Sequence, residues 1–117
     1  MVRREDLTLE VKEGTLTREG VTIVYKNNTD KYMSYGSEYF LEYKMFGDWF
    51  IIKPTDLFPV YNLMLYSVEP HSEKERLFKW EGTYGHLHKG KYRIVHDIVI
   101  PRSEYKDKYT YVEFEIK

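Results

Sequence analysis

Apolar and polar residues alternate along several short segments of this chain, and a period of two is typical of β-strands with one buried face. In residues 7–12, Leu7, Leu9 and Val11 alternate with polar residues. The last segment alternates in the same way, so that Val112 and Phe114 share one face. Strands are predicted at residues 7–12, 21–26, 37–44, 49–52, 73–80, 90–100 and 109–117.

Turn signals separate these segments. Phe46, Gly47 and Asp48 form a turn in which the glycine supplies a positive φ, so residues 37–44 and 49–52 are predicted to form a hairpin. Pro54 and Pro59 interrupt the pattern, and residues 54–72 are the least regular stretch. The apolar run at residues 60–66 predicts part of a further strand within it.

Seven or eight strands without a useful helical segment favour an all-β, antiparallel β-sandwich, although a small closed barrel fits the same pattern. With 117 residues, the chain is expected to be a single domain spanning 1–117. It contains no cysteine, so the fold has no disulfide and no thiol chemistry.

Composition adds to this interpretation. The chain has 12 Tyr, 6 Phe and 2 Trp but no alanine, a balance that favours strands over helices. Lys and Arg total 18 against 19 Asp and Glu, which argues against nucleic-acid and anionic-lipid partners. The chain as given contains no apolar stretch long enough for a signal peptide or a membrane span.

The segment from Trp80 to Val95 resembles the W-x-x-x-Y-G-x-L-x-x-G-x-Y-R-[IV] signature of a bacterial immunoglobulin-like (Ig-like) domain family. Further positions are similar to the family pattern: Leu16–Thr17, Gly20–Ile23, Asn27–Asp30, Tyr35–Gly36, Tyr39, Leu41–Glu42, Gly47–Trp49 and Val112–Ile116. The resemblance implies an Ig-like β-sandwich of exported or lipid-anchored proteins in Gram-positive-type bacteria. It implies no catalytic residue.

A tyrosine corner is expected within this segment. Tyr92 follows a glycine near the start of a strand, where its ring would cover the core and its hydroxyl would bond to backbone upstream. Antibody domains carry a cysteine two residues later, where this chain has Ile94. We expect Ile94 to pack against Ile23 in place of a disulfide.

The histidines offer one spacing suited to metal binding. His86 and His88 would project to the same side of a strand, and His96 or Asp97 would have to complete a site. The simpler interpretation is an exposed turn before Gly90, with no metal. His71 is expected to be a solvated loop residue.

No catalytic constellation is present in the sequence. It has no nucleophile elbow and no phosphate-binding glycine loop, and its carboxylates are expected on solvated faces. These carboxylates are Glu10, Glu42, Glu81, Glu113 and Glu115. We therefore predict no enzyme activity, no cofactor and no catalytic, cofactor-binding or metal-binding residue.

The aromatic residues divide into two sets by strand alternation. The first set lies on predicted core faces: Tyr25, Tyr39, Tyr43, Trp49, Phe78, Trp80, Tyr92 and Phe114. The second lies on opposite faces or in the 57–66 stretch: Phe40, Phe50, Phe58, Tyr61, Tyr66, Tyr109 and Tyr111. The second set is either covered by the long loop or available to anchor a protein or stack on a sugar. Asn27–Thr29 also matches the glycosylation sequon, to which we assign no role in a bacterial protein.

These observations predict a non-catalytic, extracellular or cell-surface module that contacts another cell-envelope protein or acts as a spacer. The alternative is a carbohydrate-binding module that uses exposed aromatic rings. We expect a monomer, because Glu113, Glu115 and Lys117 place charges on the outer face of the last strand. If it associates with itself, the 57–66 stretch is the expected interface.

Overall fold

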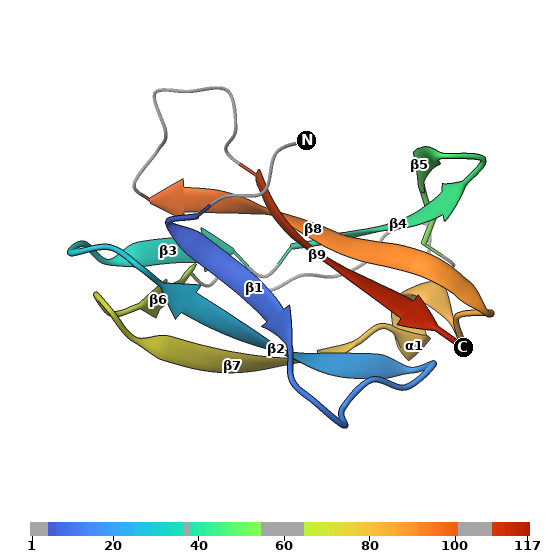
Figure 1. Cartoon of the computed structure of the whole chain (residues 1–117), viewed down its shortest axis with the longest axis horizontal. Coiled ribbons are helices and arrows are strands. Elements are labelled where there is room, and N and C mark those ends of the chain that lie inside the picture. Colours follow the sequence, from blue (N-terminus) through green and yellow to red (C-terminus); the bar gives the residue numbers. More distant parts are fainter. Residues whose placement is uncertain (1–4, 37, 55–64, 101–108) are drawn as a thin grey trace.

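The computed structural model describes residues 5–36, 38–54, 65–100 and 109–117 (Figure 1). Within these ranges the chain forms nine β-strands and one four-residue helix. In chain order they are β1 (Leu7–Val11), β2 (Gly20–Asn27), β3 (Met33–Gly36), β4 (Phe40–Met45), β5 (Asp48–Ile51), β6 (Leu65–Val68), β7 (Glu73–Lys79), α1 (Glu81–Tyr84), β8 (Gly90–Ile100) and β9 (Tyr109–Ile116). The predicted all-β class is confirmed.

The strands form two antiparallel sheets. The smaller sheet has the order β1-β2-β7, and the larger has the order β5-β4-β8-β3-β6, with β9 also paired to β8. The 11 residues of β8 allow it to pair with β9 and β4 along its first part and with β3 near its end. β8 is therefore the strand around which the larger sheet is organised.

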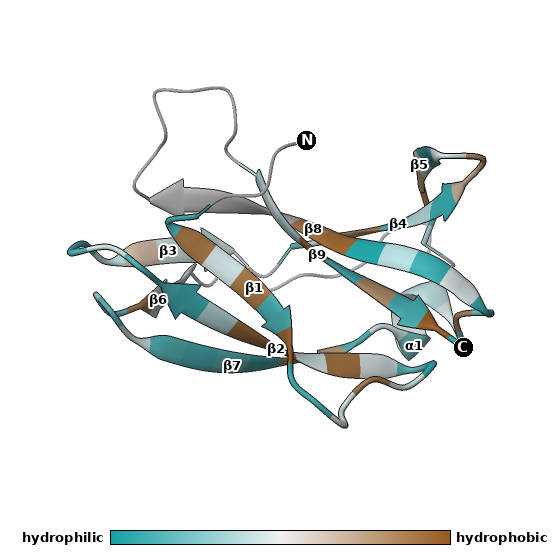
Figure 2. Ribbon diagram, in the orientation of Figure 1, coloured by the Kyte–Doolittle hydropathy of each residue, from teal (hydrophilic) through white to brown (hydrophobic). Residues whose placement is uncertain are grey.

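The core lies between the two sheets, because the buried side chains of both belong to one cluster. Leu9, Ile23 and Phe78 contribute from the smaller sheet, and Leu41 and Ile94 from the larger. Ile23 and Ile94 are both completely buried, as expected for apolar packing in place of a disulfide. Hydropathy alternates along β1 in accordance with this burial (Figure 2). Burying each such side chain contributes about 1.5–3 kcal/mol.

A row of tyrosines fills one part of the core. The rings of Tyr25 and Tyr35 stack with centroids 4.3 Å apart, and Tyr66 stacks on Tyr35 at 5.6 Å. Burial raises the pKa of Tyr35 to about 12 and raises the pKa of Tyr25 further. Both hydroxyls therefore keep their protons at neutral pH.

The strand β3 was not predicted. Its residues Met33, Ser34 and Tyr35 are all buried, so the segment shows no alternation between an apolar and a polar face. β6 contains the end of the apolar run at 60–66, and the earlier part of the 57–66 stretch lies outside the described residues. With β3, the number of strands in the described ranges is nine, whereas seven or eight were expected.

The predicted tyrosine corner is confirmed. The Tyr92 hydroxyl donates to the His88 carbonyl at 2.7 Å, and the Tyr92 ring stacks on Phe114 at 5.8 Å. Trp80, which follows β7, is completely buried, and its indole N–H donates to the Arg18 carbonyl at 2.7 Å. The segment that carried the family resemblance therefore closes one end of the core.

Candidate functional site

The structure separates the aromatic side chains that form the core from those that reach the surface. Most of those predicted for the core are buried: Tyr25, Tyr39, Phe78, Trp80, Tyr92 and Phe114. Tyr43 is partly buried and packs against the core, in agreement with its assignment. Trp49 is partly buried but does not belong to the core cluster, which corrects its assignment. Both belong to the β4–β5 hairpin, in which β4 pairs with β8 from Phe40 to Tyr43 and the turn and β5 project beyond that pairing (Figure 1).

The second aromatic set is divided. Phe40 and Phe50 are exposed, whereas Tyr109 and Tyr111 are half-buried. Tyr66 is partly buried against the core, and Phe58 and Tyr61 lie outside the described residues. The exposed aromatic rings therefore direct attention to β4 and β5.

The β4–β5 hairpin carries an apolar surface at its tip and along β5. Four exposed side chains make up this hairpin surface: Met45 (42% exposed), Phe46 (93%), Phe50 (44%) and Ile51 (66%). Met45 and Phe50 lie on one face of the hairpin, and Ile51 lies on the other face with Glu42. Large exposed apolar groups gathered at one hairpin mark a candidate interaction site. Met45, Phe46 and Ile51 were not singled out from the sequence, where Phe46 served only as a turn residue. A phenylalanine in place of the usual asparagine before a turn glycine was the available signal.

The turn at the tip holds Phe46 in solvent at a conformational cost. Phe46 has φ 53° and Gly47 has φ 83°, both in the left-handed region. Because Met45 pairs with Asp48, Phe46 and Gly47 form a two-residue hairpin loop. In such loops positive φ values match the twist of the two strands. A residue with a Cβ pays about 1–2 kcal/mol in this region.

A packed ion pair adjoins the hairpin surface on the outer face of the larger sheet. Arg93 on β8 places its Nε and Nη2 atoms each 2.6 Å from Oε1 of Glu42 on β4. The guanidinium carbon lies 4.4 Å from the Trp49 ring centroid and 5.3 Å from that of Tyr111. Because Ile51 is paired with Glu42, the hairpin surface continues directly into this packed arrangement.

Two lysines beside the hairpin surface, Lys44 and Lys53, have fewer partners than Arg93. Lys44 lies opposite Trp49 in the β4–β5 register, with its Nζ 5.8 Å from the ring centroid, and Lys53 follows β5. Within the described ranges, neither lysine is within ion-pair distance of a carboxylate. Asp48 is the acidic residue of β5. The hairpin thus combines apolar side chains with two cations.

The two tryptophans offer limited access to a sugar. Trp80 is completely buried, and one face of Trp49 is covered by the Arg93 guanidinium. Carbohydrate binding, which needs an open ring face, therefore stays a prediction.

His86 and His88 do not lie on a strand, which corrects the geometry assumed for a metal site. They belong to the loop between α1 and β8, on either side of the buried Leu87. The Nε2 atom of His86 lies 3.3 Å from Oε1 of Glu81, and its Nδ1 atom lies 3.6 Å from Oε1 of Glu19. Because these nitrogens lie on opposite sides of the ring, the two carboxylates do not converge on one ion. No group of three or more ligands suited to a metal occurs among the described side chains, which exclude His96 and Asp97.

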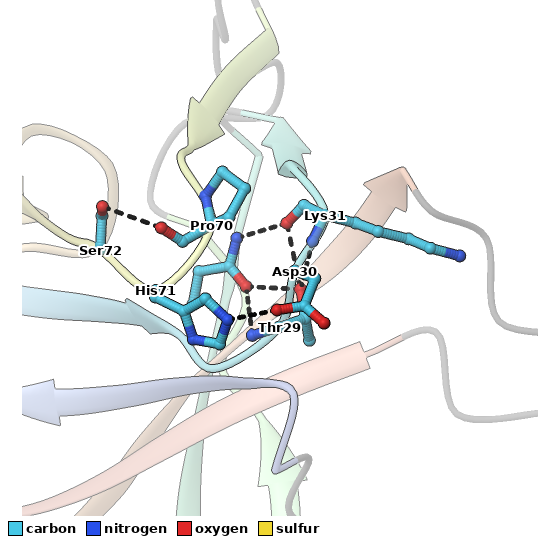
Figure 3. A network of polar contacts seen from close by, with 7 residues as sticks. Thr29, Asp30, Lys31, Pro70, His71 and Ser72 are labelled. Atoms are coloured by element: carbon cyan, nitrogen blue, oxygen red, sulfur yellow. Dashed lines mark hydrogen bonds and ion pairs between the residues drawn. The ribbon is translucent and has the colours of Figure 1, made fainter.

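Polar contacts join the loop between β2 and β3 to the loop between β6 and β7 (Figure 3). The His71 Nε2 lies 2.5 Å from the Asp30 carboxylate, so this exposed histidine has a partner in addition to solvent. The buried Asn27 amide donates to the carbonyls of Lys31 and Val68 at 2.7 and 2.9 Å. The side-chain amide nitrogen of Asn27, the atom that glycosylation of the sequon would modify, is therefore engaged in hydrogen bonds within the fold.

Among the described residues, the single short helix could not span a bilayer, and no other helix offers a candidate membrane span.

The predicted carboxylate exposure is confirmed for Glu10, Glu81, Glu113 and Glu115. Glu42 is the exception, because its contact with Arg93 largely covers it.

Comparison with known families agrees with the two-sheet fold. A family model described as Bacterial Ig-like domain matches residues 3–115. No curated protein and no solved structure shows a significant match. The match extends over nearly the whole chain, and the antiparallel sandwich without cysteine fits it. The chain therefore belongs to the bacterial Ig-like domain family.

Proposed function

We propose that this chain is a module of an exported bacterial protein and that it contacts another cell-envelope protein through the hairpin surface. Membership of the Ig-like family supports a non-catalytic module, and domains of this family are often extracellular. The sandwich serves as a rigid support, and the hairpin presents the contact residues beyond its core.

One observation carries the proposal: Phe46 is 93% exposed at a turn position that disfavours it, beside three further exposed apolar side chains. A spacer needs neither feature, because a polar turn would be more stable and more soluble. Large exposed anchors of this kind supply much of the binding energy when they enter a pocket on a partner.

The test uses a photo-crosslinking amino acid introduced into the protein in its source bacterium. One variant carries it at Phe46, and the control carries it at Leu77, an apolar residue on β7 that is 58% exposed. We expect a discrete adduct from position 46 that is absent from position 77. Equal labelling at both positions, or no adduct at either, would contradict a contact role for the hairpin.

A further inference from the structure

The outer edge of β5 presents backbone groups with no strand beside them in the described part of the chain. β5 ends the strand order of the larger sheet and pairs with β4. The Ile52 N–H donates to the Leu41 carbonyl at 2.9 Å, which identifies these residues as a hydrogen-bonded pair. Such pairs alternate with non-bonded pairs in an antiparallel ladder, so Phe50 also bonds toward β4. The N–H and C=O groups of Trp49 and Ile51 therefore point away from the sheet.

The edges formed by β9 and β7 carry features that oppose pairing with a new strand. β9 lies beside β1, where the Thr110 hydroxyl donates to the Leu7 carbonyl at 3.3 Å. On β7, Arg76 lies opposite Ile23 and turns inward, with its guanidinium carbon 4.3 Å from the Phe78 ring centroid. Inward charges and covered edges are devices that prevent edge pairing.

β5 lacks these devices. After Asp48 its residues are Trp49, Phe50 and Ile51, and the last two are well exposed. An exposed edge with apolar side chains on both faces is suited to strand addition, in which an extended segment continues the sheet.

We infer that β5 binds an extended segment of the partner protein as an added strand, an inference that rests on the proposed contact function. The backbone groups of Trp49 and Ile51 would form the hydrogen bonds. Alternate side chains of the segment would contact Ile51 on one face and Phe50 on the other, because successive residues of a strand point to opposite faces.

The charges near β5 specify the chemistry of this segment. Lys44 and Lys53 have no carboxylate partner among the described residues, so an acidic residue flanking the apolar positions is favoured. A second copy of the chain matches less well. Antiparallel pairing of two β5 strands would bring Lys53 of one copy toward the Trp49–Lys44 row of the other.

A displayed library of random ten-residue peptides, selected on the intact chain, provides the probe. Enriched peptides are expected to alternate apolar residues, to carry at least one acidic residue and to lack a central proline. Binding of a synthetic enriched peptide should slow hydrogen exchange of the Trp49 and Ile51 amides. Failure to enrich such peptides, or unchanged exchange at both amides, would overturn the strand-addition inference.

The variant Ile51→Pro removes an outward N–H without removing a bond to β4, and Ile51→Ala is its matched control. We expect peptide affinity to fall at least tenfold in Ile51→Pro and only a few-fold in Ile51→Ala. Equal losses would show that the side chain alone matters and would overturn strand addition. If Ile51→Pro does not fold, amide exchange in the unmodified protein still decides the question.

Two outcomes distinguish this inference from the proposed function. A discrete adduct from position 46 together with full peptide binding by Ile51→Pro would keep the contact function and overturn strand addition. Concentration-dependent dimerisation that is lost in Ile51→Pro, without peptide binding, would replace the acidic segment by a second copy as the occupant.

Discussion

The hydroxyl of Tyr92 is hydrogen-bonded to the carbonyl of His88, four residues earlier in the chain, at 2.7 Å. This bond ties the loop after α1 to the first residues of β8. Tyr92→Phe removes the donor and keeps the ring, so the free energy of unfolding should fall by about 1 kcal/mol. Urea denaturation measures the change. Tyr32→Phe, at a ring that is 59% exposed, is the control and should alter stability by less than about 0.5 kcal/mol.

Asn27 joins the loop after β2 to the end of β6. Its amide donates two hydrogen bonds, and its Oδ1 accepts from the Thr29 N–H and hydroxyl. Asn27→Ala removes these four hydrogen bonds, including the buried one to the Val68 carbonyl, and should destabilise the fold by about 3 kcal/mol in urea denaturation. Asn28→Ala, which removes an exposed bond to the Glu5 carbonyl, should cost under about 1 kcal/mol. Similar losses in both variants would contradict the role given to Asn27.

The Glu42–Arg93 pair provides a third prediction. Glu42→Leu leaves the largely covered Arg93 charge without its carboxylate and should cost about 3–5 kcal/mol. Adding Arg93→Met removes that charge and should recover most of the loss, as measured by a double-mutant cycle. If the two single-variant losses simply add, the pair is not coupled.

The turn at Phe46 predicts a variant that gains stability and loses function. Asparagine tolerates a positive φ, so Phe46→Asn should raise the free energy of unfolding by about 1 kcal/mol. The same variant should weaken binding of the partner captured at position 46. Gly47→Ala, at φ 83°, should destabilise the hairpin instead. A destabilised Phe46→Asn protein would contradict the assignment of cost to this turn.

Alkaline pH should destabilise the fold. Unfolded tyrosine ionises near pH 10, whereas burial raises the pKa of Tyr35 to about 12. Above about pH 10 the unfolded chain therefore binds fewer protons than the folded chain, and stability falls as pH rises. Urea midpoints between about pH 8 and 11 test this, and Tyr35→Phe should show a shallower decline. An equal decline in that variant would refute the contribution of Tyr35.

Much of the fold was predictable because its information is local. Alternation located β1, β2 and β9, and the glycine before Tyr92 indicated the corner. Two features depend on tertiary structure and were missed. β3 is buried on both faces, so alternation is absent, and the contact between Glu42 and Arg93 depends on the register of β4 and β8. Phe46 was passed over because the turn pattern rests on its neighbour Gly47.

The contact between β1 and β9 sets how the module would respond to a mechanical load. The two strands run side by side in the same direction (Figure 1), with Leu7 near Thr110 and a shallow groove lined by Leu9, Val11 and Val112 farther along. Tension applied before Leu7 and after Ile116 pulls β1 and β9 along their length in opposite directions. The load therefore acts in shear on all contacts between them at once, the geometry in which a domain between two anchored segments resists extension.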